Sequence, residues 1–434
     1  MTAEIAVISR SAVTLAADSA MTMNVRGVEK IYASADKLFE LSLLDPIGAM
    51  VFNNLEFMGA PLDVIMKQFR ASSFCVSFSN ASAVPDAFFD YLIKVWTPAK
   101  SGQDQHVSSL VRSLLDTLRL DFDARVTVAI NSYTEGSSFP DFRAMFLDVV
   151  KEYIGTCVSY PPSACFAGMK DSDIVAYHND EIERAITLGL SKLPFQPNDM
   201  GLLKTLAGAY LFHDIYSEHF TGLVFAGFGS SEMFPSLYSY EIDGIIATKL
   251  KKKNKHQIAK SQGEPSAEII PFAQRDIVDR YLEGMDSEFE NEIYNYFDAT
   301  LKSVGQGLFN GIKGVNADTR KRISNQMKTL TQSALDDFKN KLVVGLREKF
   351  RQQMEDMVLF MPKQDLANLA EALVNITSLK RRFSGDKETV AGPIDVAVIS
   401  KSDGFVWVKR KHYFDGQLNP RYFVRKFGST NPQR

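Results

Sequence analysis

The sequence contains few of the residues that form disulfide frameworks and metal centres. Its 434 residues include three cysteines, Cys75, Cys157 and Cys165, and six histidines. An odd number of cysteines in a long chain argues against a disulfide framework. The histidines show no HExxH spacing, and we interpret His213 and His219, six residues apart in an aromatic-rich stretch, as packing or surface residues. We therefore predict no metal site.

The chain also lacks phosphate-binding motifs, long apolar runs and an excess of one charge. Neither GxxxxGK[ST] nor GxGxxG after a strand is present, so we predict no nucleotide cofactor. No apolar run approaches the ~20 residues that span a bilayer, and residues 1–18 lack the basic start and unbroken apolar stretch of a signal peptide. The net charge of −3 gives no general attraction to nucleic acid or anionic membranes. These absences favour a cytoplasmic protein that binds neither.

The amino-acid composition predicts a folded chain with a substantial core. Apolar residues make up 45% and charged residues 23% of the sequence, which excludes a disordered chain. At ~150 residues per domain, the length predicts two to three domains, or one domain with large insertions.

Strand patterns dominate the beginning of the chain. Two β-rich runs, 3–8 and 12–17, are joined by a polar turn and predict a hairpin. A second pair is predicted at 37–41 and 47–52, because the Leu44-Asp45-Pro46 segment between them favours a turn. Together these runs predict a four-strand meander, on which a helix over 58–70 would pack.

The rest of the chain alternates between helical and strand patterns. Helices are expected over much of 86–218, over 276–361 and over 363–380, and strands at 222–228, 236–242, 394–399 and 405–408. The basic run 249–255 is interpreted as a solvated hairpin tip, with an anionic docking spot as the alternative. This order predicts an α+β or α/β fold whose sheets join distant parts of the chain.

Three residues near the N-terminus have the side chains of a known kind of catalytic site. Removal of Met1 would leave Thr2 with a free α-amine, a base of reference pKa ~7.7–8.0, beside a hydroxyl nucleophile. A lysine next to that hydroxyl would favour its deprotonated form, and an aspartate would hold the lysine in place. Asp18, which ends an apolar strand, and Lys37, which opens the next, have the types for these roles. Their ordinary interpretations are a turn residue and a solvated lysine.

In this arrangement the sequence resembles the proteasome-type N-terminal nucleophile (Ntn) hydrolases. The opening threonine is followed by the strand ending Leu15-Ala16-Ala17-Asp18-Ser19, then by Lys37-Leu38-Phe39-Glu40-Leu41 and by Gly48-Ala49-Met50 before a helix. The segment Phe225-Ala226-Gly227-Phe228-Gly229, with Pro235-Ser236-Leu237-Tyr238 and Asp243-Gly244, is similar to the strand pair in the middle of the family's chain. The segment from Gly392 to Ile399, with Asp403-Gly404, is similar to the closing hairpin of the family.

The resemblance implies an α+β fold, the Ntn four-layer αββα sandwich with large helical insertions. The core would comprise 1–80, 219–285 and 362–415, with helical insertions at 81–218 and 286–361 and a C-terminal tail at 416–434. Insertions of this size can lie at the edge of such a sandwich, and they could alter the family's ring contacts.

The resemblance also implies the site. Thr2 would be nucleophile and base, Asp18 and Lys37 its charged support, and the backbone of Thr22 a contact for the substrate strand. Gln274, Asp386 and Thr389 fall where the family has its remaining serine and aspartate residues. Two positions depart from the family pattern: Ala20 replaces a common arginine, and the Val51-Phe52-Asn53 segment replaces the double glycine of the oxyanion hole.

Two classes of function follow from the resemblance. The first is a threonine-type endopeptidase or amidohydrolase that cleaves an amide bond, expected to be a peptide bond, and needs no cofactor. The family also implies a homo-oligomer, and an ATPase or another protein as a candidate partner. The alternative is a catalytically inactive Ntn-fold assembly or interaction protein, which the two departures favour. A non-peptide amidase or an unrelated fold is the remaining interpretation.

Overall fold

The computed structural model describes most of the chain. It covers residues 3–25, 28–97, 99–133, 138–191, 193–258, 267–311, 314, 316–383, 392–412, 414–415 and 417–427. The chain divides into two compact units, residues 1–38 with 260–434 and residues 39–259. Each unit contains antiparallel strands and helices, which confirms a mixed fold and is compatible with the predicted α+β class. The assignment of residues 1–80, 219–285 and 362–415 to one core stays a prediction.

The first unit is built on a five-stranded antiparallel sheet in the order β12-β1-β2-β13-β14. Its strands are β1 (Ala3–Ile8), β2 (Ala12–Ala17), β12 (Glu268–Ala273), β13 (Asp395–Ser400) and β14 (Gly404–Lys409). The predicted N-terminal and C-terminal hairpins are therefore confirmed, and they lie side by side because β2 pairs with β13. Two strands from opposite ends of the sequence, β2 and β13, thus pair directly.

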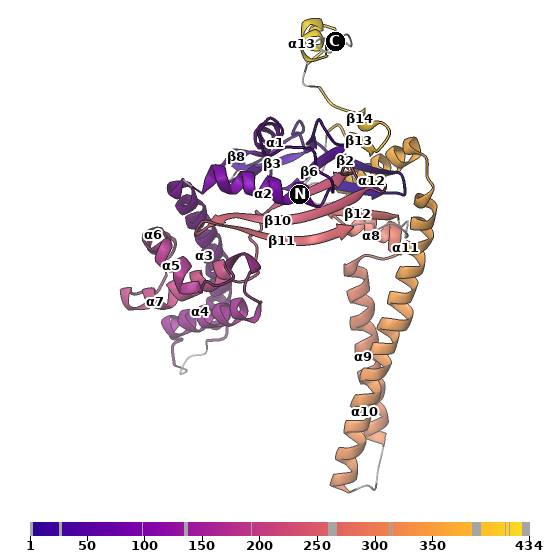
Figure 1. Cartoon of the computed structure of the whole chain (residues 1–434). Helices are drawn as coiled ribbons and strands as arrows, with labels where there is room; N and C mark the ends of the chain where they lie inside the picture. Colours follow the sequence, from indigo (N-terminus) through magenta and orange to yellow (C-terminus); the bar gives the residue numbers. More distant parts are fainter. Residues whose placement is uncertain are drawn as a thin grey trace. The chain divides into compact units, whose positions relative to one another are not determined.

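One face of this sheet is covered by helices. Helix α12 (Lys363–Phe383) packs across β1, β2 and β13, and α8 (Asp276–Glu283) and α11 (Val344–Leu359) complete the layer (Figure 1). The core there joins alternate strand residues, such as Ile5 and Val7, to Leu366, Ala370 and Leu373, which recur at helical spacing. The helix predicted over 363–380 is confirmed.

The predicted four-strand meander is wrong. A small hairpin, β3 (Met21–Val25) and β4 (Val28–Tyr32), follows β2, and the next strands, β5 (Leu38–Glu40) and β6 (Ile47–Asn53), belong to a different sheet. Strand β2 already pairs with β1 on one edge and with β13 on the other. Both of its edges are therefore occupied, and local sequence patterns could not reveal the distant partner.

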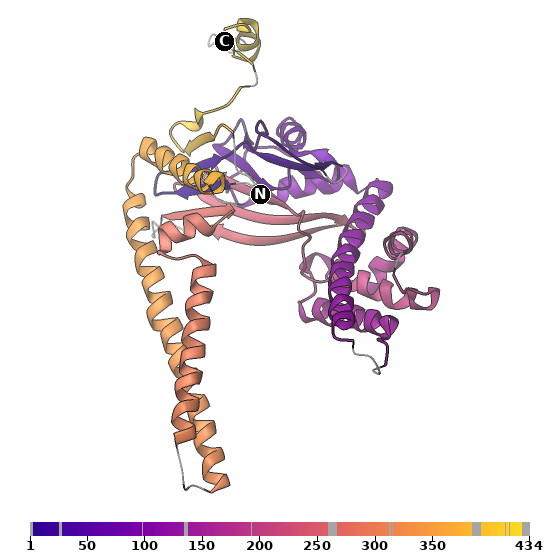
Figure 2. The same ribbon diagram turned by 180° about the vertical axis from the view of Figure 1, so that it is seen from behind.

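Two helices of the first unit form a long antiparallel pair. Helices α9 (Ser287–Gly311) and α10 (Ala317–Asp337) lie side by side, as Figures 1 and 2 show from opposite sides. The π-helical segment η3 (Phe338–Val343) links α10 to α11, and the ring of Phe338 stacks on that of Phe297 with centroids 4.2 Å apart. We call the segment 287–347 the hairpin. The prediction of helix over most of 276–361 is confirmed. A short helix, α13 (Pro420–Phe427), follows β14.

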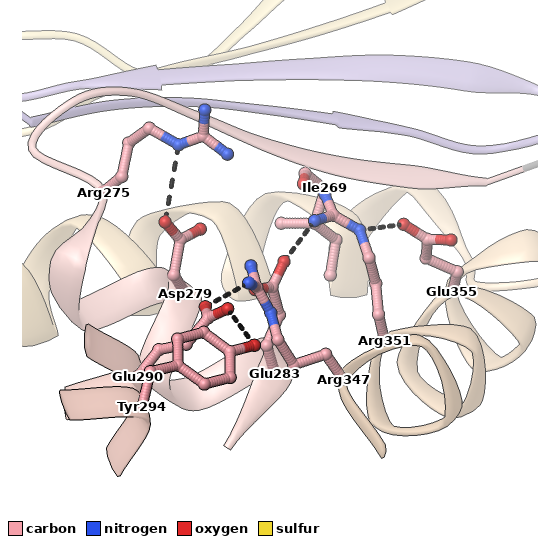
Figure 3. Close-up of polar contacts among 9 residues, drawn as sticks. All are labelled: Ile269, Arg275, Asp279, Glu283, Glu290, Tyr294, Arg347, Arg351 and Glu355. Carbon is pink, nitrogen blue, oxygen red and sulfur yellow. Dashed lines mark hydrogen bonds and ion pairs between the residues drawn. The ribbon is translucent and has the colours of Figure 1, made fainter. Parts of the chain in front are cut away.

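An ion-pair network fixes the base of the hairpin (Figure 3). The buried Glu283 of α8 accepts hydrogen bonds from Arg347 and Arg351, and Arg347 also pairs with Glu290 of α9 at 2.5 Å. Arg351 donates a further hydrogen bond to the carbonyl of Ile269 in β12 at 3.1 Å. The network therefore connects α8, α9, α11 and the sheet.

The second unit contains a five-stranded antiparallel sheet in the order β11-β10-β9-β6-β5. Strands β9 (Thr221–Gly227), β10 (Ser236–Ile246) and β11 (Lys249–Ile258) form a meander, which confirms the predicted strands at 222–228 and 236–242. Gly227 has a φ of 145°, and a Cβ there would lie 2.0 Å from the carbonyl oxygen of Pro46, so only glycine fits. A two-residue pair, β7 (Glu56–Phe57) and β8 (Ala60–Pro61), precedes the helices.

The helices of the second unit form two apolar cores. Helices α1 (Leu62–Arg70) and α2 (Ala83–Trp96) pack with the sheet through aromatic residues such as Phe69, Phe88 and Phe225. A second core joins α3 (Lys100–Asn131), α4 (Phe142–Ser159), α5 (Asp171–Tyr177), α6 (Asn179–Gly189) and α7 (Met200–Phe212), with the 3-10 turns η1 (Ala164–Phe166) and η2 (Pro197–Asp199). The predicted helices over 58–70 and within 86–218 are confirmed. No helix among the described residues is long and apolar enough to cross a membrane.

The sequence predicts a solvated hairpin tip for the basic run 249–255, and this prediction is wrong. It lies within β11, which pairs with β10 along its length. Lys251 is buried and donates a hydrogen bond to the carbonyl of Leu211 at 2.9 Å, and Lys252 lies over the ring of Phe89. The side chains of the successive residues Lys251 and Lys252 thus lie on opposite faces of the strand. A charge count along the sequence cannot distinguish this arrangement from a solvated turn.

Candidate active site

A buried ion-pair cluster lies at the beginning of β1. The Nζ atom of Lys37 is 2.5 Å from Oδ1 of Asp18 and 3.0 Å from Oε1 of Glu4. The exposed fractions are 1% for Lys37, 2% for Asp18 and 0% for Glu4. The cluster thus places one lysine between two acidic side chains away from water. Because unpaired buried charges cost several kcal/mol each, each side chain of the cluster is constrained by the others.

Backbone groups hold Asp18 in position. Its Oδ1 accepts a hydrogen bond from the N–H of Ala3 at 3.1 Å, and its Oδ2 accepts one from the N–H of Ala20 at 3.1 Å. The N–H of Asp18 in turn donates to the carbonyl of Ala3 at 3.1 Å. Charge-assisted bonds of this kind are among the stronger ones in proteins. Asp18 therefore orients Lys37 and is also hydrogen-bonded to Ala3, the residue that follows Thr2.

Gln274 lies just past the end of β12, the strand that pairs with β1 on the edge opposite β2. Ala3 pairs with Ala273, the last residue of β12, and Gln274 follows directly. Ala273 has a φ of 60°, an uncommon conformation for a residue other than glycine, which typically costs ~1–3 kcal/mol and occurs often at functional sites. Gln274 is buried, and its Oε1 accepts a hydrogen bond from Nε of Arg381 in α12 at 2.9 Å.

The structure brings together some of the residues that the sequence singled out. Asp18 and Lys37 form an ion pair, and Gln274 lies one residue past the strand partner of Ala3. Thr2, Asp386 and Thr389 lie outside the described residues. Thr22 lies in β3 opposite Ile31 of β4, and its side chain is also outside the described part.

The residues at the expected position of the oxyanion hole belong to the second unit. Val51 and Phe52 are buried residues of β6 that pair with Leu223 and Gly222 of β9. Asn53, the last residue of β6, has a φ of 65°, and its side-chain amide donates to the carbonyls of Glu218 and Phe220.

Sequence reasoning missed Glu4 and Arg381. Glu4 carries a recognisable signal, because it is the one charged residue within the otherwise apolar run from Ala3 to Ile8. A lone acid in a strand that is buried on both faces requires a cationic partner. Arg381 gives no such signal, since it is one of three consecutive basic residues at the end of α12.

The described residues include no group of three or more His, Cys, Asp and Glu side chains arranged to bind a metal ion. Comparison of the chain with models of protein families, with curated proteins and with solved structures gives no match. The chemistry of the cluster therefore has to be argued from its own geometry.

Proposed function

We propose that the chain is a threonine hydrolase of the Ntn type that cleaves an amide bond in a peptide or protein. The observation that carries the proposal is the burial of Lys37 between Asp18 and Glu4. Asp18 also accepts a hydrogen bond from the N–H of Ala3, which follows Thr2 in the sequence. A lysine that served only solubility would extend into water. The αββα sandwich with helical insertions at 81–218 and 286–361 is part of the same proposal.

The proposed reaction uses both groups of Thr2 after Met1 has been removed. The α-amine accepts the hydroxyl proton while the hydroxyl oxygen attacks the carbonyl carbon of the substrate. The C–N bond then breaks, the proton passes to the departing amine, and an ester to Thr2 remains. Water hydrolyses that ester and restores the hydroxyl. The cation of Lys37 stabilises negative charge that develops on the hydroxyl oxygen, and Asp18 keeps the lysine in place.

An extended peptide is the form of substrate that the proposal favours. Strand β3 pairs with β4 alone among the described strands, so its second edge has no strand partner there. Peptides commonly add to such edges through main-chain hydrogen bonds. Thr22 lies on β3, only four residues after Asp18.

The decisive experiment is the mass of the purified native chain together with its reaction with a threonine-directed β-lactone. The proposal predicts loss of Met1 and a covalent adduct on Thr2. Thr2→Ala should give no adduct, Thr2→Ser should retain some, and Lys37→Met should slow labelling by at least ~100-fold, as loss of a transition-state charge partner does. Lys30→Met, a change of an exposed lysine in the same unit, should label at the normal rate. Quantitative retention of Met1 would contradict the proposal.

The second candidate is an inactive assembly or interaction protein that keeps the fold. It is favoured by Ala20 and by Val51 and Phe52, since bulky buried residues replace the glycines that let a substrate carbonyl approach the backbone. An oxyanion donor is worth ~3–4 kcal/mol of the reaction barrier, so its loss could abolish activity. A chain that loses Met1 but does not react with the β-lactone would support this candidate.

A further inference from the structure

The hairpin carries a stripe of exposed apolar side chains on α9. None of the described side chains of α9 is buried. Phe289, Tyr296, Val304 and Leu308 have exposed fractions of 52%, 76%, 55% and 64%. Their spacing of seven, eight and four residues puts them along one side of the helix. The stripe borders the side that contacts α10 and η3, since Phe297, which stacks on Phe338, falls between Val304 and Leu308 around the helix.

The inner pair of the stripe, Tyr296 and Val304, is symmetric about Thr300. Phe289 and Leu308 lie 11 residues before and 8 residues after Thr300, while Tyr296 and Val304 each lie four residues from it. A two-fold axis across the helix near Thr300 would therefore set Tyr296 of one copy opposite Val304 of the other, and Phe289 near Leu308. In a two-fold interface the same surface serves both copies, so a self-complementary stripe is the pattern that it requires.

Charge is distributed along the hairpin in the same self-complementary way. The half near the sheet, residues 287–299 and 335–347, contains six Asp and Glu residues against three Lys and Arg, a net charge of −3. The half near the tip, residues 300–334, contains six Lys and Arg residues against one Asp, a net charge of +5. Parallel copies would place like charges together, whereas antiparallel copies place each acidic half beside a basic half.

We propose that the hairpin is an interface between two copies of this chain, packed antiparallel around a two-fold axis near Thr300. The network around Glu283 and Arg347 supports this role, because it joins the base of the hairpin to the sheet and so presents a defined surface (Figure 3). Four helices, two from each copy, would then bury the exposed stripe. The proposal does not depend on whether Thr2 is catalytic.

Cysteine cross-linking tests the position of the axis. Thr300→Cys should form a disulfide between copies under mild oxidation, because the two residues meet at the axis. Glu288→Cys is the matched control on the same helix. At ~1.5 Å per residue it lies ~18 Å from the axis, so its two copies are ~36 Å apart and should not cross-link. Wild-type chain, which has three cysteines of its own, gives the background.

Charge reversal tests the direction of packing by sedimentation equilibrium. The variants Glu288→Lys/Glu292→Lys and Lys321→Glu/Arg322→Glu should each weaken self-association by at least about tenfold, and an equimolar mixture of the two should form a heterodimer. Heterodimer formation also shows that both variants are folded. The pair Asp116→Lys/Asp148→Lys, exposed changes in the second unit, should leave association unchanged. The wild-type dimer should weaken between about 0.05 M and about 0.5 M salt.

The outcomes are distinguishable from those for the catalytic proposal. Thr2→Ala should form the same dimer as wild type, whatever its reactivity. A chain that remains monomeric at micromolar concentration, or a dimer that Thr300→Cys does not cross-link, would overturn the hairpin interface, and the stripe would then serve a different partner.

Discussion

The N–H of Ala3 donates a hydrogen bond to the same carboxylate oxygen of Asp18 that lies 2.5 Å from the ammonium of Lys37. One oxygen atom thus joins the backbone at the beginning of β1 to a buried cation. Because Asp18 directly follows β2 and Lys37 directly precedes β5, the contact depends on the pairing of β1 with β2 and on the return of the chain after β4. The geometry of the candidate site is therefore a property of the folded unit.

The first prediction concerns the stability of this cluster. Lys37→Met should lower the free energy of unfolding of the first unit by about 3–5 kcal/mol, because it leaves two buried carboxylates without their cation. The triple variant Lys37→Met/Asp18→Asn/Glu4→Gln should regain part of that loss, since no buried charge remains. Urea denaturation measures both effects, with the exposed Lys30→Met as control. A Lys37→Met chain as stable as wild type would show that the cluster is solvated.

The second prediction concerns the base of the hairpin. Glu283→Gln removes the charge that Arg347 and Arg351 share, and should lower stability by about 2 kcal/mol. The two arginines are each about one-third exposed, so water offsets part of the lost interaction. Hydrogen exchange should accelerate in α8 and α11 in particular. Glu348→Gln, an exposed change in α11, should have no such effect. Equal exchange in the two variants would contradict the proposed role of the network.

The third prediction is a pH dependence that arises from Lys251. Burial lowers the pKa of this lysine from 10.5 to about 8. Between these values Lys251 binds more protons in the unfolded chain than in the folded chain, so its contribution to the free energy of unfolding of the second unit should rise with pH. The thiols of Cys75, Cys157 and Cys165 act in the opposite direction, because burial raises their pKa values. The full interval corresponds to roughly 3 kcal/mol. The free energy of unfolding should be measured only up to about pH 9.5, because the tyrosine side chains of the unfolded chain lose their protons above that pH.

Matched variants isolate the contribution of Lys251. The stability of Lys251→Met relative to wild type should fall as the pH rises above about 8, because the variant lacks the contribution of Lys251, while the exposed Lys249→Met on the same strand should keep the wild-type pH profile. Thermal unfolding monitored through the second unit is a suitable readout. A pH profile of Lys251→Met identical to that of wild type would show that Lys251 makes no such contribution.

The sequence was informative where a pattern is local and uninformative where it depends on a distant partner. Hairpins at 3–17 and 394–408 follow from alternation and turn residues, and α12 follows from its apolar spacing. The pairing of β2 with β13 could not be predicted from local patterns, because it joins residues that are far apart in the sequence, such as Ala16 and Val396. In the candidate site, Asp18 and Lys37 were found through their types and positions, whereas Arg381 reaches Gln274 only through the packing of α12.

The last prediction links Glu4 to the proposed reaction. The α-amine must be neutral to accept a proton, and nearby carboxylates favour its charged form. Glu4→Gln removes one of the two carboxylates on Lys37 and leaves Asp18 in contact with the lysine. The rate of β-lactone labelling should therefore reach half of its maximum at a lower pH than in wild type. Glu29→Gln, a change on β4 in the same unit, is the control for a general effect of charge. If Glu4→Gln and Glu29→Gln gave the same pH profile as wild type, Glu4 would have only a structural role beside Lys37. If Glu4→Gln abolished labelling at every pH while remaining folded, the carboxylate itself would be needed to position the lysine.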